Sequence, residues 1–184
     1  PAAVRPRTTT PEAIIAPVSH TEHRATAPAS VTCFVLTVSD TRTEATDTSG
    51  RAIVELLSAG GHRVAGRGLV KDDAREVRAI VEAALGQPDV QVVITTGGTG
   101  ISSRDATFES LAGLFEKRLD GFGELFRMLS YEQIGAAAML SRAIAGTKGQ
   151  MAVFALPGSE AAVRLALEKL ILPEIGHVVR ELHR

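Results

Sequence analysis

Beyond the first thirty residues, apolar runs alternate with stretches in which apolar residues recur every three or four positions. The apolar runs are short and rich in β-branched residues, as in strands that are covered on both faces. Strands are expected at 31–40, 62–70 and 90–96, and amphipathic helices at 47–61 and 73–86. This order of strand, helix, strand, helix and strand predicts an α/β protein whose mostly parallel sheet carries helices on both faces.

The second half of the chain has a less regular order. Helical spacing continues over 107–119, and the small residues of 136–146 favour another helix. Between these two segments, Gly121 and Gly123 flank Phe122, which predicts a sharp turn rather than a continuous helix. A further strand and turn are expected at 149–159, a strong helix at 160–172, and a last helix that begins at Pro173.

The first thirty residues have a different composition. They are rich in Pro, Ala and Thr and show no sustained period, so 1–30 is expected to be a disordered tail and 31–184 a single domain. The segment lacks the apolar core of a signal peptide, and no apolar run approaches the roughly 20 residues that span a bilayer. We therefore expect a cytoplasmic protein without a membrane partner.

Composition and charge narrow the classes of function. The chain has 184 residues, of which 45% are hydrophobic, and this suffices for one domain with a real core. The net charge of −1 argues against non-specific binding to nucleic acid, which needs an excess of basic surface. Cys33 is the sole cysteine, so no disulfide can form within the chain, and its place in a predicted strand favours a buried thiol.

Four polar or glycine-rich clusters follow directly after predicted strands. They are "SDTR" at 39–42, "KDD" at 71–73, "TTGGTG" at 95–100 and "PGS" at 157–159. The carboxyl ends of parallel strands share one edge of a sheet, and ligands bind in the crevice outside that edge. Clusters far apart in sequence are therefore expected to meet at one site.

The cluster at 95–100 is suited to an anion. Gly97, Gly98 and Gly100 allow backbone N–H groups to approach an anion closely. Hydroxyl donors come from Thr95, Thr96, Thr99 and Thr107, and the last of these stands near an expected helix start, whose dipole favours an anion. The loop matches neither the Walker A pattern nor G-x-G-x-x-G. The alternative is a plain strand-to-helix turn in which Asp105 caps the helix.

Two aspartates at the same edge indicate a cation. A carboxylate beside a phosphate loop is unfavourable unless a cation bridges them, and Mg²⁺ takes one or two carboxylates together with phosphate oxygens. Asp72 and Asp105 are the candidates, since Asp73 can cap the helix that follows. For each of them, capping remains the alternative. Arg104 is expected either to reach phosphate or only to pair with Asp105.

The signature "VITTGGTGISSRD" resembles that of the MoaB/MogA family of molybdenum cofactor biosynthesis proteins, which also includes the G domain of gephyrin. "LTVSDTR", "DTSG", "GFGELFRMLSYEQIG", "AMLSRAIAG" and "FALPGS" look like family motifs in family order. The resemblance covers about residues 31 to 182 and lies closest to the bacterial MoaB branch. It implies a three-layer α/β/α sandwich that assembles as a homotrimer or hexamer, and contacts with other proteins of the cofactor pathway.

The implied activity is Mg²⁺-dependent adenylyl transfer from ATP to molybdopterin. The family's catalytic, metal-holding aspartates fall on Asp72 and Asp105. Binding of the pterin and its phosphate is expected from Thr96, Gly97, Gly98, Thr99, Gly100, Arg104, Thr107, Pro157, Gly158 and Ser159. The nucleotide side is expected to be closed by Ser39, Asp40, Asp47, Ser49 and Gly50, with turn formation and capping as the alternative for the two aspartates of this group.

The chain departs from the family pattern at the start of the helix after the signature. The family often reads "RDVTPEA" where this chain has "RDATFES", so Phe108 replaces a proline and Ser110 an alanine. Proline pre-organises the first turn of a helix, so its loss is expected to loosen this turn. Three alternatives to the transferase stay open: a pterin carrier without turnover, a nucleotide pyrophosphate hydrolase like related competence-damage proteins, and a scaffold.

Overall fold

The computed structural model describes residues 27–103 and 105–184. Most of the predicted tail and Arg104 therefore lie outside the described residues. Residues 27–30 belong to the described part, where the Ser30 hydroxyl donates a hydrogen bond of 2.8 Å to the carbonyl of Gly61. The division of the chain near residue 30 stays a prediction.

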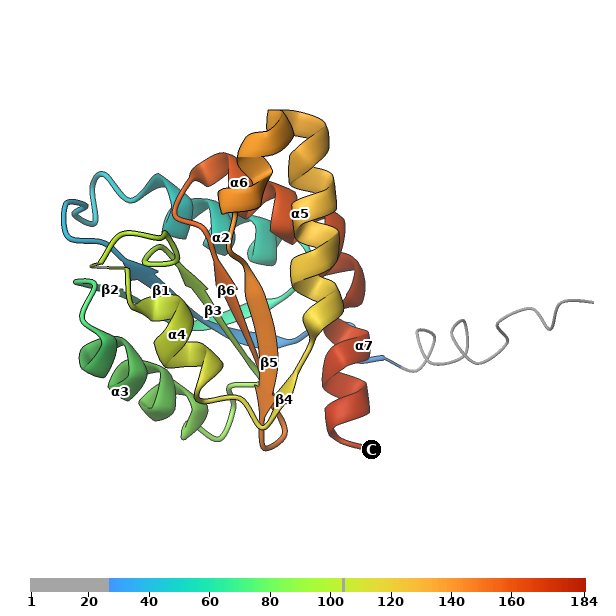
Figure 1. Ribbon diagram of the computed structural model, residues 1–184. Helices are drawn as coiled ribbons and strands as arrows, with labels where there is room; N and C mark the ends of the chain where they lie inside the picture. The colour runs from blue at the N-terminus through green and yellow to red at the C-terminus, as the bar shows by residue number, and fades with distance from the viewer. Residues whose placement is uncertain (1–26, 104) are drawn as a thin grey trace, which may run out of the picture.

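Six strands form one sheet in the order β2-β1-β3-β6-β5-β4 (Figure 1). They are β1 (Thr32–Val38), β2 (Arg63–Val70), β3 (Val92–Thr96), β4 (Lys117–Arg118), β5 (Ile144–Lys148) and β6 (Met151–Leu156). The first, second, third and sixth strands run parallel, whereas β5 pairs antiparallel with both β6 and β4. The prediction of a mostly parallel sheet is confirmed.

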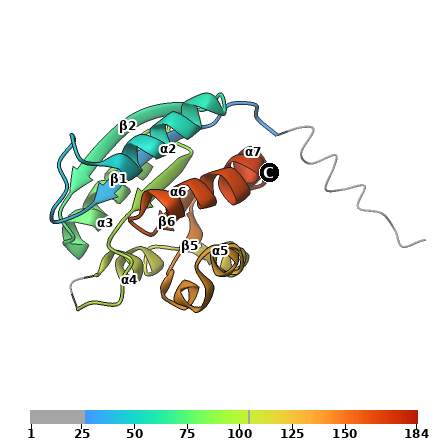
Figure 2. The same ribbon diagram turned by 90° about the horizontal axis from the view of Figure 1, so that it is seen from above.

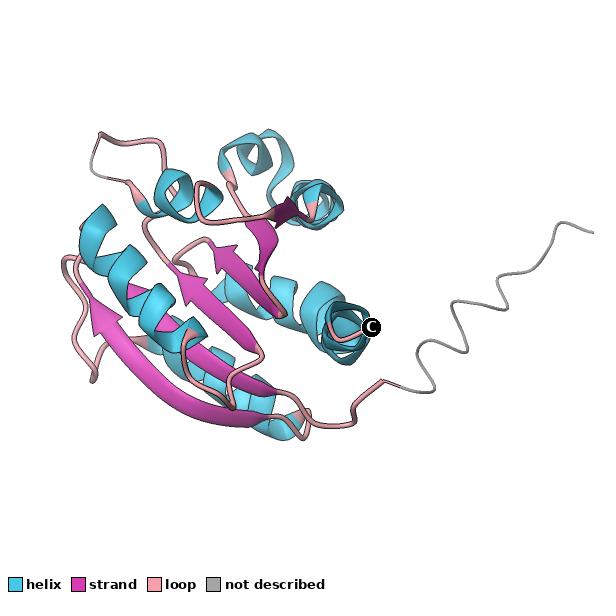
Figure 3. Ribbon diagram, turned by 90° about the horizontal axis from the view of Figure 1, so that it is seen from below, coloured by secondary structure: helices cyan, strands magenta, loops and turns pink. Residues whose placement is uncertain are grey.

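Helices cover both faces of the sheet (Figures 2 and 3). They are α2 (Thr48–Ala59), α3 (Ala74–Leu85), α4 (Thr107–Ala112), α5 (Asp120–Ile134), α6 (Glu160–Ala166) and α7 (Leu172–Leu182). Alternate residues of β1 enter separate cores: Cys33 and Val35 pack in the core shared with α2, α5, α6 and α7, and Leu36 and Val38 in the core shared with α3 and α4. Two cores separated by one sheet make the three-layer α/β/α sandwich.

The predicted turn at residues 121–123 is wrong, because α5 runs unbroken through it. Gly123 is there for packing. A Cβ at Gly123 would lie 2.7 Å from the carbonyl oxygen of Ala143, so the missing side chain lets the helix approach the segment that leads into β5. Gly123 therefore serves a tertiary contact that local sequence does not reveal, whereas a Cβ on Gly121 would meet nothing within 4 Å.

Two further helix predictions need correction. The helix expected over 107–119 ends at Ala112, and the chain then forms the edge strand β4. The helix expected over 136–146 is a short 3₁₀ turn, η1 (Gly135–Leu140), followed by β5. A ring packs against β5 at Gly146, where a Cβ would collide with Phe115. Close packing, not helix propensity, explains the glycine at this position.

The last two helices are continuous rather than restarted at Pro173. A π turn, η2 (Leu167–Ile171), joins α6 directly to α7, and Pro173 lies in the first turn of α7. Pro173 has no N–H to donate, so it interrupts the hydrogen-bond series of this continuous helix without ending it. The helical character predicted for 160–172 and from Pro173 onward is confirmed, but the predicted break at Pro173 is wrong.

Cys33 lies in the middle of the core. Its side chain is fully buried, and burial raises the pKa of its thiol to about 12. The buried thiol expected from its place in the strand is confirmed. Within the described residues, no helix is both long and apolar enough to cross a membrane.

Candidate functional site

The four clusters that follow the strands meet around one cavity of about 590 Å³. The loops after β1, β3 and β6 come together at the upper left of Figure 1. Of the residues predicted for the site, the cavity is lined by Ser39, Asp40, Asp72, Gly97, Gly98, Thr99, Gly100, Asp105, Pro157, Gly158 and Ser159. The convergence predicted from strand ends is therefore observed.

The remaining predicted residues lie behind the wall of the cavity. The Thr96 hydroxyl donates to the Pro157 carbonyl at 2.9 Å, and the Thr107 hydroxyl donates to Asp72 at 3.2 Å. Thr95 is fully buried in β3, and its hydroxyl has no hydrogen-bond partner in the described part of the chain. Asp47, Ser49 and Gly50 are also buried, and Arg104 lies outside the described residues.

The glycine loop is shaped by two left-handed residues. Gly97 has φ of +99° and Gly98 has φ of +64°, a region that residues with a side chain rarely adopt. A Cβ on Gly97 would collide with the Val38 carbonyl, so the loop lies directly against the end of β1. Gly98, Thr99 and Gly100 line the cavity, and no acceptor is bonded to their N–H groups among the described residues. Successive N–H groups without acceptors are suited to binding an anion.

Asp72 stands next to this loop. A Cβ on Gly98 would come within 2.8 Å of both of its carboxylate oxygens. Burial raises the pKa of Asp72; hydrogen bonds from the Thr107 hydroxyl and the Ala106 N–H oppose this, and the charges of Asp105 and Asp40 raise it further. The net effect is a raised pKa, which means that the surrounding protein groups do not fully stabilise the negative charge of the ionised carboxylate.

Asp105 lies across the loop from Asp72. Its Oδ2 accepts a hydrogen bond of 2.8 Å from the Ser102 N–H, and a Cβ on Gly100 would lie 2.6 Å from the same oxygen. The N-cap of α4 is Ala106, without a side-chain capping bond. The alternative that Asp105 caps this helix is therefore wrong. Its carboxylate closes the 102–105 turn and lines the cavity.

The donors fit Mg²⁺ shared with a phosphorylated ligand. Asp40, Asp72 and Asp105 provide hard oxygen donors on the cavity wall, and the raised pKa of Asp72 is the property that a cation would offset. The described residues contain no group of three or more His, Cys, Asp or Glu side chains arranged to hold a metal alone. Mg²⁺ needs no such cage, since it uses one or two carboxylates and takes its other ligands from phosphate and water.

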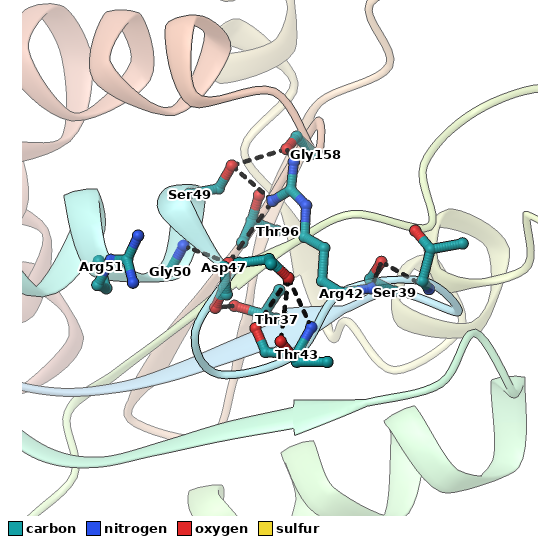
Figure 4. A network of polar contacts seen from close by, with 12 residues as sticks. Thr37, Ser39, Arg42, Thr43, Asp47, Ser49, Gly50, Arg51, Thr96 and Gly158 are labelled. Atoms are coloured by element: carbon teal, nitrogen blue, oxygen red, sulfur yellow. Dashed lines mark hydrogen bonds and ion pairs between the residues drawn. The ribbon is translucent and has the colours of Figure 1, made fainter.

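Asp47 is the centre of a buried network beneath the first loop (Figure 4). Its carboxylate is fully buried and accepts hydrogen bonds from the Thr37 hydroxyl at 2.6 Å and the Gly50 N–H at 2.9 Å. Arg67 pairs with Oδ2 at 2.6 Å and Arg42 with Oδ1 at 3.5 Å. Sequence reasoning placed Asp47 at the nucleotide, whereas the structure turns its carboxylate inward, as in the capping alternative.

Arg42 joins the first loop to the turn after β6 and was not predicted as a site residue. Its guanidinium donates to the Ser49 hydroxyl and to the Gly158 carbonyl, each at 2.8 Å (Figure 4). Ser49 donates to the same carbonyl at 2.8 Å. The two bonds to the Gly158 carbonyl link residues more than a hundred positions apart, so only the "SDTR" pattern itself could have pointed to Arg42.

Fold and site together define an α/β protein with a glycine-rich loop and a pair of carboxylates at the carboxyl edge of its sheet. Residues 34–177 match the family described as "Probable molybdopterin binding domain". The chain is 55% identical over 168 residues to molybdenum cofactor biosynthesis protein B of Bacillus cereus, which covers 91% of this chain and 99% of that protein. The chain therefore belongs to the MoaB/MogA family of molybdenum cofactor biosynthesis proteins.

Solved structures agree. A crystal structure of molybdenum cofactor biosynthesis protein B has a TM-score of 0.84 and 55% identity, covering 86% of this chain and 99% of that one. The tungsten cofactor synthesizing protein MoaB from Pyrococcus furiosus has a TM-score of 0.78 and 42% identity, covering 86% of this chain and 100% of that one. The three-layer fold implied by the resemblance is confirmed.

Proposed function

We propose that this chain transfers the adenylyl group of ATP to the terminal phosphate of molybdopterin, in the presence of Mg²⁺, within molybdenum cofactor biosynthesis. The observation that carries the proposal is the run of Gly98, Thr99 and Gly100, whose N–H groups have no acceptor among the described residues, on the wall of a cavity that Asp72 and Asp105 also line. N–H donors suited to an anion, next to carboxylates whose charge is not balanced by the protein, fit a phosphate that binds together with a divalent cation.

The reaction asks the protein chiefly to place anions. An oxygen of the pterin's terminal phosphate, ionised near neutral pH, attacks the α-phosphorus of ATP. The bond from that phosphorus to the oxygen shared with the β-phosphate breaks, and its electron pair leaves with pyrophosphate. Because the nucleophile carries no proton that must be removed, no strong general base is needed. Positioning and charge stabilisation then provide most of the rate.

The chain's residues divide this work by their positions. The loop 97–100 would bind the pterin's terminal phosphate through its N–H groups, and the turn 157–159 would line the pterin side. Ser39 and Asp40 would close the nucleotide side. Asp47, Ser49 and Gly50 would act indirectly, by holding the loop that carries Ser39 and Asp40.

Asp72 and Asp105 would hold the cation. Bound Mg²⁺ would supply neutralisation of the phosphate charge that moves onto pyrophosphate. Asp72 is oriented for this by the Thr107 hydroxyl and Asp105 by the Ser102 N–H. Each carboxylate is therefore fixed by a donor from the protein before a ligand enters.

The proposal extends to a homotrimer or homohexamer. Large apolar side chains are exposed on α5 and on η1, namely Leu125, Met128, Tyr131, Ile134, Met139 and Leu140. Exposed apolar surface of this kind supports a contact between protein chains. Light scattering of the purified protein is expected to give three or six times the chain mass, and a monomer would remove this part of the proposal.

The decisive experiment incubates the protein with molybdopterin, ATP and Mg²⁺ and detects adenylylated molybdopterin by mass. Asp105→Asn is expected to keep molybdopterin binding but to lose turnover by about 100-fold, because a carboxylate on the metal matters most in the transition state. The amide oxygen can still accept from the Ser102 N–H, so the turn is retained. Wild-type turnover by this variant would remove Asp105 from the mechanism.

Asp89→Asn is the matched control. This carboxylate is exposed and makes one ion pair of 3.4 Å with Arg63, and it does not line the cavity. The control is expected to turn over like the wild type. Tight molybdopterin binding without product from any variant would instead identify a carrier, the alternative in which the same pocket performs no chemistry.

A further inference from the structure

Arg142 makes three contacts at the back of the glycine loop. Its Nε donates a hydrogen bond of 2.9 Å to the carbonyl oxygen of Thr99. Its two terminal nitrogens donate to the two carboxylate oxygens of Glu109, at 2.7 and 3.1 Å. Its Cζ lies over the ring of Phe108, 4.3 Å from the ring centroid. Each of the three guanidinium nitrogens therefore donates one hydrogen bond, to Thr99 or to Glu109.

The contact with Thr99 sets the direction of a peptide plane. In a trans peptide, the carbonyl oxygen of one residue and the N–H of the next point in opposite directions. Holding the Thr99 oxygen toward Arg142 therefore fixes the Gly100 N–H on the side away from Arg142. Thr99 and Gly100 both line the cavity, and the Gly100 N–H has no acceptor among the described residues.

Phe108 and Glu109 hold the guanidinium in place from α4. Glu109 and Arg142 form a bidentate pair, and hydrogen bonding from Arg142 is the first cause of a lowered pKa for Glu109. The Phe108 ring supports the flat face of the cation. Arg142 follows η1, where Leu140 and Ser141 already reach the cavity, so its backbone is anchored beside the same site.

Resting on the proposed function, we propose that Arg142 is a positioning residue for the phosphate loop, and that Phe108 and Glu109 set its orientation. The loss of proline at position 108 was expected to loosen the start of α4. The structure shows what the phenylalanine provides in its place, namely a platform beneath Arg142. Arg142, Phe108 and Glu109 together form what we call the clamp. Through the Arg142 side chain, the clamp connects α4 and the end of η1 to the glycine loop.

The test compares Arg142→Gln with Arg78→Gln. Arg78 makes an exposed pair with Glu82 on α3 and touches no loop of the site, so it controls for loss of an arginine and an ion pair. Arg142→Gln is expected to weaken binding of inorganic phosphate roughly 10-fold, since a charge-assisted hydrogen bond is lost. It is also expected to lower the ¹⁵N order parameter of the Gly100 amide, because its peptide plane is no longer held by Arg142. Both are measured by ¹⁵N NMR on the full chain.

A smaller change follows from removing the platform alone. Phe108→Leu keeps an apolar side chain and removes the ring, and it is expected to weaken phosphate binding about 3-fold. In turnover assays, Arg142→Gln is expected to raise KM for molybdopterin more than it lowers kcat, which a general loss of folded protein would not do.

The outcomes separate the clamp from the transferase proposal. A lower Gly100 order parameter and weaker phosphate binding in Arg142→Gln support the clamp even where the wild type shows no adenylylation. Phosphate binding and a Gly100 order parameter equal to those of Arg78→Gln overturn it, whatever the activity of the wild type. Should phosphate leave the wild-type loop amides unshifted, the loop does not bind phosphate, and an unchanged Gly100 order parameter in Arg142→Gln then rejects the clamp as well.

Discussion

Asp47 and Asp72 lie at the same edge of the sheet, and their surroundings are opposite. For Asp47, burial favours a higher pKa, but hydrogen bonds from Thr37, the Gly50 N–H and Arg67 outweigh it, and the pKa is lowered. For Asp72, burial dominates, neighbouring carboxylates add to it, and the pKa is raised. One carboxylate has its charge compensated inside the protein, and the other does not.

This difference separates a carboxylate that stabilises a loop from a carboxylate that is available to a ligand. A carboxylate with two arginines and two further donors stabilises the loop that it supports and has little capacity left for a ligand. A carboxylate that faces a cavity with two others is costly to the isolated protein, and a cation would recover that cost. The position of an aspartate after a strand cannot distinguish the two cases, whereas its partners can.

The largest expected effect comes from Asp72→Asn. Turnover is expected to fall by 100-fold or more, about 3 kcal/mol of transition-state stabilisation, because a carboxylate for the cation is lost. Metal-free stability is expected to hold or rise. The folded-state pKa of Asp72 is raised, so its contribution to wild-type stability is greatest at low pH and is lost as pH rises through the raised value.

Thermal unfolding without metal, measured between about pH 4 and pH 7, checks this second effect. The wild type should lose stability over that interval relative to Asp72→Asn. An asparagine variant that is less stable than the wild type at neutral pH, yet fully active, would place Asp72 with Asp47 among the structural carboxylates.

Next in size is Asp47→Ala, which leaves Arg42 and Arg67 without their buried partner. We expect a loss of about 3 kcal/mol in the free energy of unfolding, toward the lower limit for buried pairs because each arginine side chain is 28% exposed. Denaturant unfolding measures it. Catalytic loss should follow the loss of folded protein, and full stability with absent turnover would mean that Asp47 contacts the nucleotide after all.

The pH dependence of Asp47 should have the opposite sign to that of Asp72. Its folded-state pKa is lowered, so its contribution is present above the ordinary carboxyl pKa and is lost as pH falls through the lowered value. Asp47→Asn is therefore expected to flatten the acid limb of the stability curve below about pH 4. An acid limb as steep as that of the wild type would show that other carboxylates control acid unfolding.

The smallest effect is expected from Ser159→Ala. Ser159 lines the cavity, but its hydroxyl accepts a bond of 3.3 Å from the Ala162 N–H and so caps α6. Loss of the cap is expected to cost about 1 kcal/mol of stability. The KM for molybdopterin should change less than about 3-fold if the hydroxyl is committed to the cap. A larger rise in KM would assign this hydroxyl to the ligand.

Prediction from sequence succeeded for residues whose place follows from the end of a strand or the start of a helix. Asp72 and Asp105 could be placed at one edge because parallel strands end together, and Asp73 could be recognised as the cap of α3. It failed where distant contacts decide. The partners of Asp47 come from β1, β2 and the first loop, and the contacts of Arg142 come from α4 and the glycine loop. Such pairings leave no periodic signal in the chain.

The errors in secondary structure have the same origin. Gly123 was interpreted as a turn residue, although its role is to admit the Ala143 carbonyl beside α5. The small residues of 136–146 favoured a helix by propensity, yet the last of them form β5, where Gly146 packs against Phe115. In both places, a missing side chain marks where another group fits, which becomes visible only when the neighbour is known.

The single thiol, in the middle of the sheet, allows the rate at which the native sheet opens to be measured. Cys33 is buried within β1 between its two neighbouring strands, and with a pKa of about 12 it carries almost no thiolate at neutral pH. A thiol reagent can therefore modify the native chain only after the sheet opens around it. The rate of labelling at this one sulfur atom measures how often the sheet that carries the glycine loop opens, and bound ligand should slow the labelling.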